Sequence, residues 1–285
     1  MKPSSNIIRF YHNLGMYKTI DVFSESGFRS IDFNADLAEF CDDTHDKAFY
    51  TELKKYANDR GIDFGQSHAP FASSYPDAQL SEHRFFEITT AIKHASYLDS
   101  PMIVVHPCQH IDYVVGGDNS EIYEYNIDFY KRLIPYSEEY GVKIALENIN
   151  GKGGRHICSF AQDLVKMYEE LNNDAFTVCF DVGHMNLLGL PIGDAIRTVG
   201  GRIKCLHVHD NGGISDDHTL PYCGKIDWED VTKALADIGY SGNLNYEAGY
   251  FIRTTPPKLY PDAAKYMVSV ANHLISKIEY YKALK

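Results

Sequence analysis

One short stretch, residues 205–227, concentrates side chains that could bind a metal ion. It reads CLHVHDNGGISDDHTLPYCGKID and holds three histidines and four aspartates. Mixed imidazole and carboxylate ligands suit Zn²⁺ or Mn²⁺ better than Ca²⁺. A solvated loop could carry the same residues by chance, so the interpretation depends on whether other segments supply matching ligands.

Further metal-capable side chains stand at or near the ends of six apolar, β-rich runs. In chain order these are His68, His106, Glu147, Asp181, His207 and Glu247. A lone histidine at such a place more often just finds a hydrogen-bond partner, and a buried carboxylate is rare unless it is paired or metal-bound. At equivalent positions their carboxylates would repel one another, and a divalent cation would resolve that conflict.

A second group of candidates lies on the connections that follow two of these runs. His184 stands on the turn after FTVCFD, and Asp216 and His218 form a D-x-H pair in the 205–227 stretch. Asp217 is adjacent to Asp216, which leaves open which of the two aspartates points inward. A metal ion or a substrate could be bound by this second group.

The pair His207 and His209 poses a similar choice. Residues two apart in a strand share a face, so either histidine could be the ligand and the other could face a substrate. Asp227, by contrast, precedes a helical pattern, and an aspartate at a helix N-cap needs no chemistry to explain it.

Strand-like runs alternate with helical patterns along the whole chain. The expected strands cover residues 6–11, 30–33, 63–68, 102–107, 143–148, 176–181, 203–210 and 243–248, and the clearest helices cover 46–60, 81–98, 121–140, 160–171, 228–238 and 261–281. Gly61, Gly141 and Gly239 follow helical runs as C-terminal caps do. This alternation predicts an α/β fold with a parallel sheet.

Eight strand–helix units suit a single (β/α)8 TIM barrel, which we expect to occupy residues 1–285 as one domain. An open doubly wound sheet is the alternative, but it usually carries a GxGxxG turn after its first strand, and the sequence has none. In a barrel the carboxyl ends of the strands meet at one mouth, so the six strand-end side chains would converge there.

The composition restricts the kinds of partner that we expect the chain to bind. The chain has 39 acidic against 27 basic residues and a formal net charge of −12, which argues mildly against a broad surface for nucleic acid. No apolar run is long enough for a membrane span, and the N-terminus has no apolar signal-peptide region. The six cysteines form no CxxC pair, so we expect free thiols and a cytoplasmic location. The sequence leaves open whether the protein forms a homo-oligomer.

Several short motifs, in this order and spacing, resemble the xylose-isomerase-like TIM-barrel superfamily. They are SHAP at 67–70, VVHP at 104–107, ALEN at 145–148, CFDVGH at 179–184, HVHDN at 207–211, DDH at 216–218 and the late Glu247. That superfamily includes sugar phosphate isomerases and epimerases and the endonuclease IV family of abasic-site nucleases (AP endonuclease family 2). The resemblance extends from about residue 31 to residue 250 and identifies the superfamily, not one reaction within it.

For a sugar or sugar-phosphate isomerase or epimerase, the resemblance implies one divalent ion held by Glu147, Asp181, His207 and Glu247. His207, followed three residues later by Asp210, matches the family pattern better than His209 does. Glu147 and Glu247 would be the acid/base pair that moves a proton beside a carbonyl. The residues expected to face a carbohydrate substrate are His68, His106, His184 and His209.

For an endonuclease IV-like enzyme, the resemblance implies three zinc ions, so the metal content could be one to three. The additional ligands would be His68, His106, His184, Asp216 and His218. Two loops oppose this alternative: HAPFASSYPD has no Lys or Arg, and NADLAEFCDDTHD is acidic and would repel phosphates. We therefore expect the isomerase or epimerase, with zinc or manganese. A barrel that binds sugar or metal without turnover is the third hypothesis.

Overall fold

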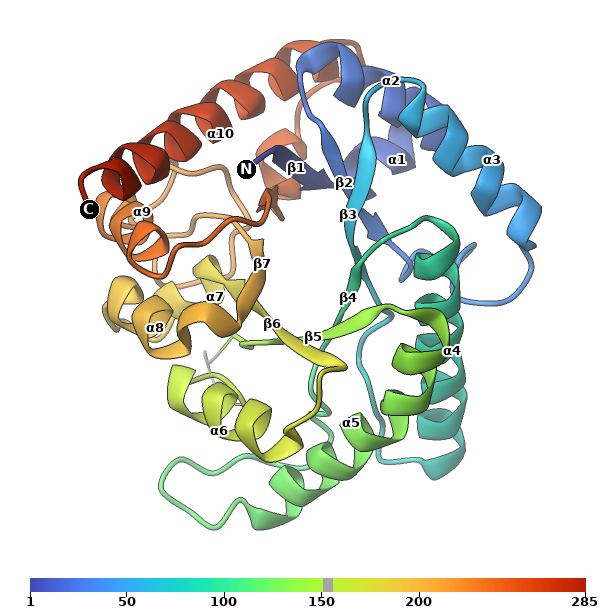
Figure 1. Ribbon diagram of the computed structural model, residues 1–285, viewed down its shortest axis with the longest axis vertical. Helices are drawn as coiled ribbons and strands as arrows, with labels where there is room; N and C mark the ends of the chain where they lie inside the picture. Colours follow the sequence, from blue (N-terminus) through green and yellow to red (C-terminus); the bar gives the residue numbers. More distant parts are fainter. Residues whose placement is uncertain (151–155) are drawn as a thin grey trace.

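The predicted alternation of strands and helices forms a parallel sheet that closes into a barrel, with helices around it (Figure 1). This computed structural model describes residues 1–150 and 156–285. The strands are β1 (Pro3–Asn6), β2 (Ser30–Asn34), β3 (Asp63–His68), β4 (Met102–Val105), β5 (Lys143–Glu147), β6 (Phe176–Asp181), β7 (Ile203–His207) and β8 (Leu244–Tyr246).

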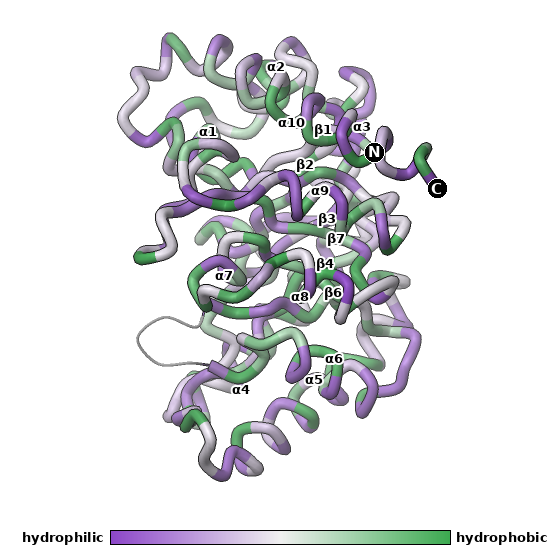
Figure 2. Tube along the Cα trace, turned by 90° about the vertical axis from the view of Figure 1, so that its left-hand side faces the viewer, coloured by the Kyte–Doolittle hydropathy of each residue, from purple (hydrophilic) through white to green (hydrophobic). Residues whose placement is uncertain are grey.

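The helices of the described residues cover the outside of this barrel. They are α1 (Ile8–Leu14), α2 (Met16–Ser26), α3 (Lys47–Asn58), α4 (Ala78–Tyr97), α5 (Ser120–Tyr140), α6 (Ala161–Leu171), α7 (Val182–Asn186), α8 (Ile192–Val199), α9 (Trp228–Asp237) and α10 (Tyr260–Ala283). Short 3₁₀ turns are η1 (Gly200–Arg202), η2 (Gly249–Ile252) and η3 (Pro257–Leu259). Hydrophobic and hydrophilic stretches alternate along the helices, as expected for helices with one buried face (Figure 2).

Strand order confirms the expected (β/α)8 fold. Each strand pairs in parallel with the next from β1 to β7, and β8 pairs with β1. A bridge between Val208 and Tyr246 closes the ring, with the Val208 amide donating to the Asn245 carbonyl at 2.8 Å. The first and last strands are thus neighbours, and the barrel uses the described chain from its beginning to its end.

Local signals fix several helix ends. Asp227 accepts hydrogen bonds from the amides of Glu229 and Asp230, so the predicted N-cap of α9 is confirmed. Gly141 ends α5 in the left-handed conformation, at φ 66°, as a C-terminal glycine should. Asp227 thus marks where α9 begins, and Gly141 ends α5 just before β5 enters the barrel.

The prediction for the first strand was wrong. Residues 6–11 belong mostly to α1, and β1 is Pro3–Asn6, with the sequence PSSN. Ile7 and Phe10, three residues apart, are both buried, a helical spacing that a short apolar run does not separate from a strand. Ser4 and Ser5 are buried in the strand without any hydrophobic signal.

Other differences concern the length of one strand and two helices that were not predicted. The expected strand over 203–210 ends at His207, and α2 and α8 were not among the predicted helices. His184, expected on a turn, lies in the short helix α7, which begins directly after β6. Of these helices, α7 carries a side chain of the barrel mouth, His184.

The cysteines of the chain are free thiols, as predicted, and four of them are buried. No helix among the described residues is both long and apolar enough to cross a membrane.

Candidate metal centre

The ends of four neighbouring strands deliver a tight group of ligand-type side chains. Glu147 ends β5, Asp181 ends β6, His207 ends β7 and Glu247 directly follows β8. One ligand atom from each lies within 4.8 Å of the others, and we call these four residues the inner cluster. Asp181 and His207 are register partners across β6 and β7, so the sheet itself sets their spacing.

His207 is the centre of the inner cluster. Its Nδ1 lies 2.8 Å from Oε1 of Glu147, 3.6 Å from Oε2 of Glu247 and 3.9 Å from Oδ2 of Asp181. The His207, Glu147 and Asp181 side chains are fully buried, whereas that of Glu247 is 20% exposed. A basic nitrogen and three carboxylates at this density can share a cation.

The electrostatics of the inner cluster are those of a charge pair removed from water. Burial alone would raise the pKa of Glu147, but the nearby His207 and His106 outweigh it and hold that pKa well below its usual range. Burial would lower the pKa of His207, and Glu147 and Glu247 instead raise it well above its usual value. In the metal-free protein His207 is therefore the cation that neutralises the carboxylates.

Asp32, on β2, was missed by the sequence reasoning. Its Oδ2 lies 3.4 Å from Nε2 of His207, on the far side of the ring from the carboxylates. Gln66 and Asn245 donate to the same oxygen at 3.0 and 2.9 Å. A carboxylate behind a ligating histidine fixes the orientation of the ring and raises its basicity. The sequence signal was an acidic residue between two apolar residues, Ile31 and Phe33, of a predicted strand.

His68 and His106 extend the inner cluster towards β3 and β4. Nε2 of His106 lies 2.9 Å from Oε2 of Glu147, and Nε2 of His68 lies 3.2 Å from that same His106 nitrogen. Nδ1 of His68 donates to the carbonyl of Ala69 at 2.8 Å. With its proton on Nδ1, His68 presents an unprotonated Nε2 to the mouth, which is the tautomer that a metal or a hydroxyl donor requires.

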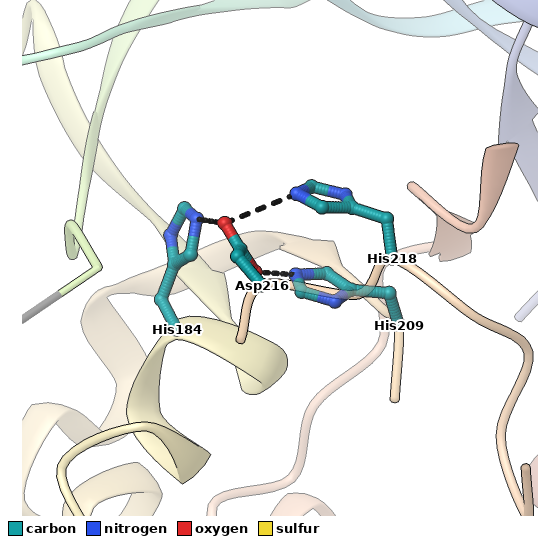
Figure 3. Close-up of side chains that lie close together, drawn as sticks. All are labelled: His184, His209, Asp216 and His218. Carbon is teal, nitrogen blue, oxygen red and sulfur yellow. Dashed lines mark ion pairs between the residues drawn. The ribbon is translucent and has the colours of Figure 1, made fainter. Parts of the chain in front are cut away.

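A second group lies nearer to the surface and is shown in Figure 3. It consists of His184, His209, Asp216 and His218, whose ligand atoms also lie within 4.8 Å of one another, and we call it the outer cluster. The oxygen Oδ2 of Asp216 lies 3.3 Å from Nε2 of His184 and 3.2 Å from Nε2 of His218. The rings of His209 and His218 are stacked 4.0 Å apart.

Two rings of the outer cluster are anchored by the backbone. Nδ1 of His184 donates to the carbonyl of Asn148 at 2.9 Å, and Nδ1 of His218 donates to that of Glu247 at 2.8 Å. Both rings therefore turn Nε2 towards Asp216. Histidines that bind metal commonly donate their other nitrogen to a carbonyl in this way.

Asp181 joins the two clusters. Its Oδ1 lies 3.1 Å from Nε2 of His209 and accepts from the backbone amide of His184 at 2.6 Å, which caps α7. Its Oδ2 faces His207 of the inner cluster. One carboxylate thus contributes an oxygen to each group.

The loop after β7 is held in place by Asp210. Its carboxylate accepts from the amides of Asn211, Tyr222 and Ile226 and from Nε1 of Trp228, at 2.8 to 3.2 Å. The loop returns over the mouth and brings Asp216 and His218 into the outer cluster. The acid three residues after His207 is therefore a structural anchor of the loop.

Gly183 makes room for His209. A Cβ at position 183 would lie 2.0 Å from the His209 ring, so a side chain there would displace it. This close approach explains the glycine in the CFDVGH motif.

The residues present fit a divalent metal ion. Oδ2 of Asp181, Oδ1 of Asp216 and Nδ1 of His209 are buried without a hydrogen-bond partner among the described residues. Leaving so many buried polar atoms unsatisfied is costly, and ligation would satisfy them. The nitrogen and oxygen donors suit zinc or manganese.

The structure resolves the two choices that the sequence left open. Asp216 points into the outer cluster, whereas Asp217 accepts from the amide of Gly212 at 3.2 Å and from the hydroxyl of Ser215. His207 lies in the inner cluster and His209 in the outer one. All other candidate side chains named from the sequence gather at the same mouth.

A cavity of about 280 Å³ opens beside both clusters. His68, His218 and Glu247 form one side of it, and Phe71, Asp36 and Tyr250 lie further along its wall. Its size is at the low end of typical small-ligand pockets. A small polar molecule in it could touch Glu247 and the histidines together.

With this fold and site, the chain belongs to the xylose isomerase-like TIM barrel family, whose sequence model matches residues 20–270.

Curated relatives include a sugar epimerase, an uncharacterized protein and a probable endonuclease. D-psicose 3-epimerase of Ruminiclostridium cellulolyticum is 28% identical over 233 residues, which cover 80% of this chain and 76% of that protein. The uncharacterized protein MJ1311 of Methanocaldococcus jannaschii is 32% identical over 186 residues, and the chain spans only 62% of its length. A probable endonuclease 4 of Shouchella clausii is 26% identical over 171 residues, which cover 55% of this chain and 56% of that protein.

Among solved structures, that of the IOLI protein with a bound zinc atom superimposes with a TM-score of 0.77 at 20% identity, and the match covers 99% of each chain. At this identity the likeness supports the fold alone.

Proposed function

We propose that the protein is a divalent-metal-dependent isomerase or epimerase of a sugar or sugar phosphate. The observation that carries this proposal is the placement of two glutamates, Glu147 and Glu247, in one cluster beside a small cavity. The names of the epimerase relatives support the same class of substrate. A homo-oligomer and a cytoplasmic location stay predictions.

The metal would be held by Glu147, Asp181, His207 and Glu247, and when bound it would supply the positive charge that makes a carbonyl and its neighbouring C–H more acidic. Glu247, which lines the cavity, removes or returns the proton on the carbon beside the carbonyl. Glu147 serves as its partner for the opposite face. The proton taken from one face is thus matched by one given to the other, and no oxidant is required.

The histidines orient the substrate. His68 lines the cavity, and its Nε2 can accept a hydrogen bond from a sugar hydroxyl because its Nδ1 donates to the Ala69 carbonyl. His218 lines the same cavity from the side of the outer cluster. We assign His106, His184 and His209 to the same task or to a second ion.

Exchange of substrate hydrogen with solvent tests the proposal. Zinc- or manganese-loaded protein is incubated with a panel of ketoses and ketose phosphates in D₂O, and deuterium at the carbon beside the carbonyl is followed by NMR. Glu247→Gln keeps the size of the side chain but not the base, so exchange should fall by about 10²- to 10⁴-fold. Exchange that persists in Glu247→Gln, or no exchange with any ketose, would remove this function and leave a binding protein or a nuclease.

The outer cluster favours one second candidate, an endonuclease IV-like hydrolase of abasic DNA. His184, Asp216 and His218 converge there as an additional metal site would require, and His209 adds a fourth ligand-type side chain. Incubation with abasic DNA tests it: incision abolished by His218→Ala would replace the epimerase proposal. The metal content of the native protein separates the two as well, since one ion per chain favours the epimerase and three zinc ions favour the nuclease.

A further inference from the structure

The cavity that His68, His218 and Glu247 line is also lined by side chains of α1. Arg9 and His12, both from α1, line it together with Tyr250 from η2. Neither Arg9 nor His12 forms an ion pair with a carboxylate within the described ranges, 1–150 and 156–285. Asp36 and Glu247 line the same cavity, but neither lies within 4.0 Å of the Arg9 guanidinium.

The Arg9 side chain is held in place by its surroundings. Its guanidinium carbon lies 4.7 Å from the centre of the Tyr250 ring, and that of Arg253 lies 5.0 Å from the same centre. Cation–π contacts of this kind hold a guanidinium in place without neutralising its charge. Tyr250 is itself fixed by its backbone amide, which donates to the His218 carbonyl at 3.2 Å.

Gly249 provides the space for this arrangement. A Cβ at position 249 would lie 2.8 Å from Cγ of Arg9, so any larger residue would push the arginine aside. Arg9 is thus a partly buried, positioned cation whose hydrogen-bonding edge has no protein acceptor in the described part of the chain. A planar guanidinium of this kind is suited to a two-point contact with a phosphate or a carboxylate.

One small molecule could meet both groups of side chains. His68, His218 and Glu247 line the same space of about 280 Å³ as Arg9 and His12. A ketose with its carbonyl beside Glu247 could place a terminal substituent against Arg9.

We propose that the substrate carries an anionic terminal group, a phosphate or a carboxylate, which Arg9 binds with Tyr250 and Gly249 as its support. This inference rests on the proposed function for the identity of the sugar, but not for the anion contact itself. His12 lies beside Arg9 and adds a second donor for the same group. Arg9 is a binding residue in this scheme and takes no part in proton transfer.

Binding by calorimetry tests the contact directly. The metal-loaded protein is titrated with fructose, fructose 1-phosphate, fructose 6-phosphate and fructuronate, which separate the neutral sugar, the phosphate and the carboxylate. At least one anionic ketose should bind about 10- to 100-fold more tightly than fructose, the usual range for hydrogen bonds to charged groups. Equal or weaker binding of all three anionic ketoses, including no binding at all, overturns the inference.

Three variants show whether Arg9 is responsible. Arg9→Met should abolish the preference for the anionic ketose, and Arg9→Lys should keep part of it because the charge remains without the two-point geometry. Lys258→Met is the matched control: it removes one exposed positive charge from η3, outside the cavity, and should keep the preference. An unchanged preference in Arg9→Met, or an equal loss in Lys258→Met, contradicts the proposal.

The result for the anion site does not depend on the result for the epimerase proposal. If no ketose exchanges its proton but the anionic preference depends on Arg9, the anion site stands and the proposed reaction fails. If fructose exchanges its proton and no anionic ketose is preferred, the reaction stands and the anion site fails.

Discussion

The inner and outer clusters contain similar side chains but are built in different ways. The inner cluster comes from the ends of strands β5 to β8, whose spacing is set by the hydrogen-bonded register of the barrel. The outer cluster takes one residue from α7 and three from the segment after β7. The strand-end residues of the inner cluster are fully buried, whereas the side chains of Asp216 and His218 are 23% and 21% exposed.

This difference shows that the inner cluster is the part of the site that the fold itself preorganises. Strand register would hold the inner ligands even if the neighbouring loop moved. The outer ligands depend on the loop anchored by Asp210 and on the space left by Gly183. We therefore expect substitutions to separate the two clusters, except at Asp181, which belongs to both.

The largest effect is expected for Asp181→Ala. It leaves His207 and His209 buried without their shared carboxylate and uncaps α7. Removing one partner of a buried charge pair costs about 3–5 kcal/mol, and the protein should also lose its bound metal. Urea unfolding measures the loss of stability, and elemental analysis measures the metal content. The control is Asp217→Ala, which changes an acid that points away from the cluster; unchanged metal content in Asp181→Ala would contradict the site.

A smaller and more selective effect is expected for Gly183→Ala. The added methyl group would meet the His209 ring, and overpacking of this kind costs about 1–3 kcal/mol. Any ion that the outer cluster binds should be lost while the inner cluster keeps its own. Zinc titration before and after the substitution measures this, with Gly201→Ala as the control, because a Cβ at position 201 meets nothing within 4 Å. Equal loss of both sites would show that the clusters are one unit.

Asp32→Asn should affect the inner cluster alone. Asparagine preserves the shape of the side chain but not the charge behind His207. Loss of such a supporting carboxylate typically lowers metal affinity by about 10- to 100-fold. Competition with a chelator of known affinity measures the change. An unaltered affinity would mean that Asp32 serves only the network with Gln66 and Asn245.

The smallest effect is a dependence of metal stabilisation on pH. Burial would lower the pKa of His184 and of His218, but Asp181 and Asp216 raise that of His184 to about 10, and Asp216 and Glu247 raise that of His218 to about 9. A raised pKa stabilises the metal-free fold fully below the unfolded value of about 6.5, and this stabilisation is lost as pH rises towards 9.

Metal must displace those protons, so its affinity should rise over the same interval. The difference in Tm between metal-loaded and metal-free protein should therefore widen from pH 6.5 to pH 9. Calorimetry at pH 7 in buffers of different ionisation enthalpy should show proton release on zinc binding. A constant difference in Tm, with no protons released, would mean that the outer cluster binds no metal.

Much of the fold followed from the sequence because its signals are local. Glycines after helices, Asp227 before α9 and the apolar runs of β4 and β6 each act within a few residues. The first strand escaped because its residues, PSSN, are small and polar, and the adjacent Ile7 and Phe10 fit a helix or a strand equally well. Its place in the barrel is set by pairing with β2 and β8, which no local pattern records.

For the site, the sequence by itself determined that Glu147, Asp181, Glu247 and one of the pair His207 and His209 stand near strand ends. It did so because strand ends in a barrel converge whatever their distance in the chain. Only the tertiary structure decided that Asp216 rather than Asp217 points inward, that Asp32 stands behind His207, and that Arg9 reaches the cavity over Tyr250. Those contacts join residues far apart in the sequence, and their geometry depends on the closed ring, on the loop held by Asp210 and on the space left by Gly183 and Gly249.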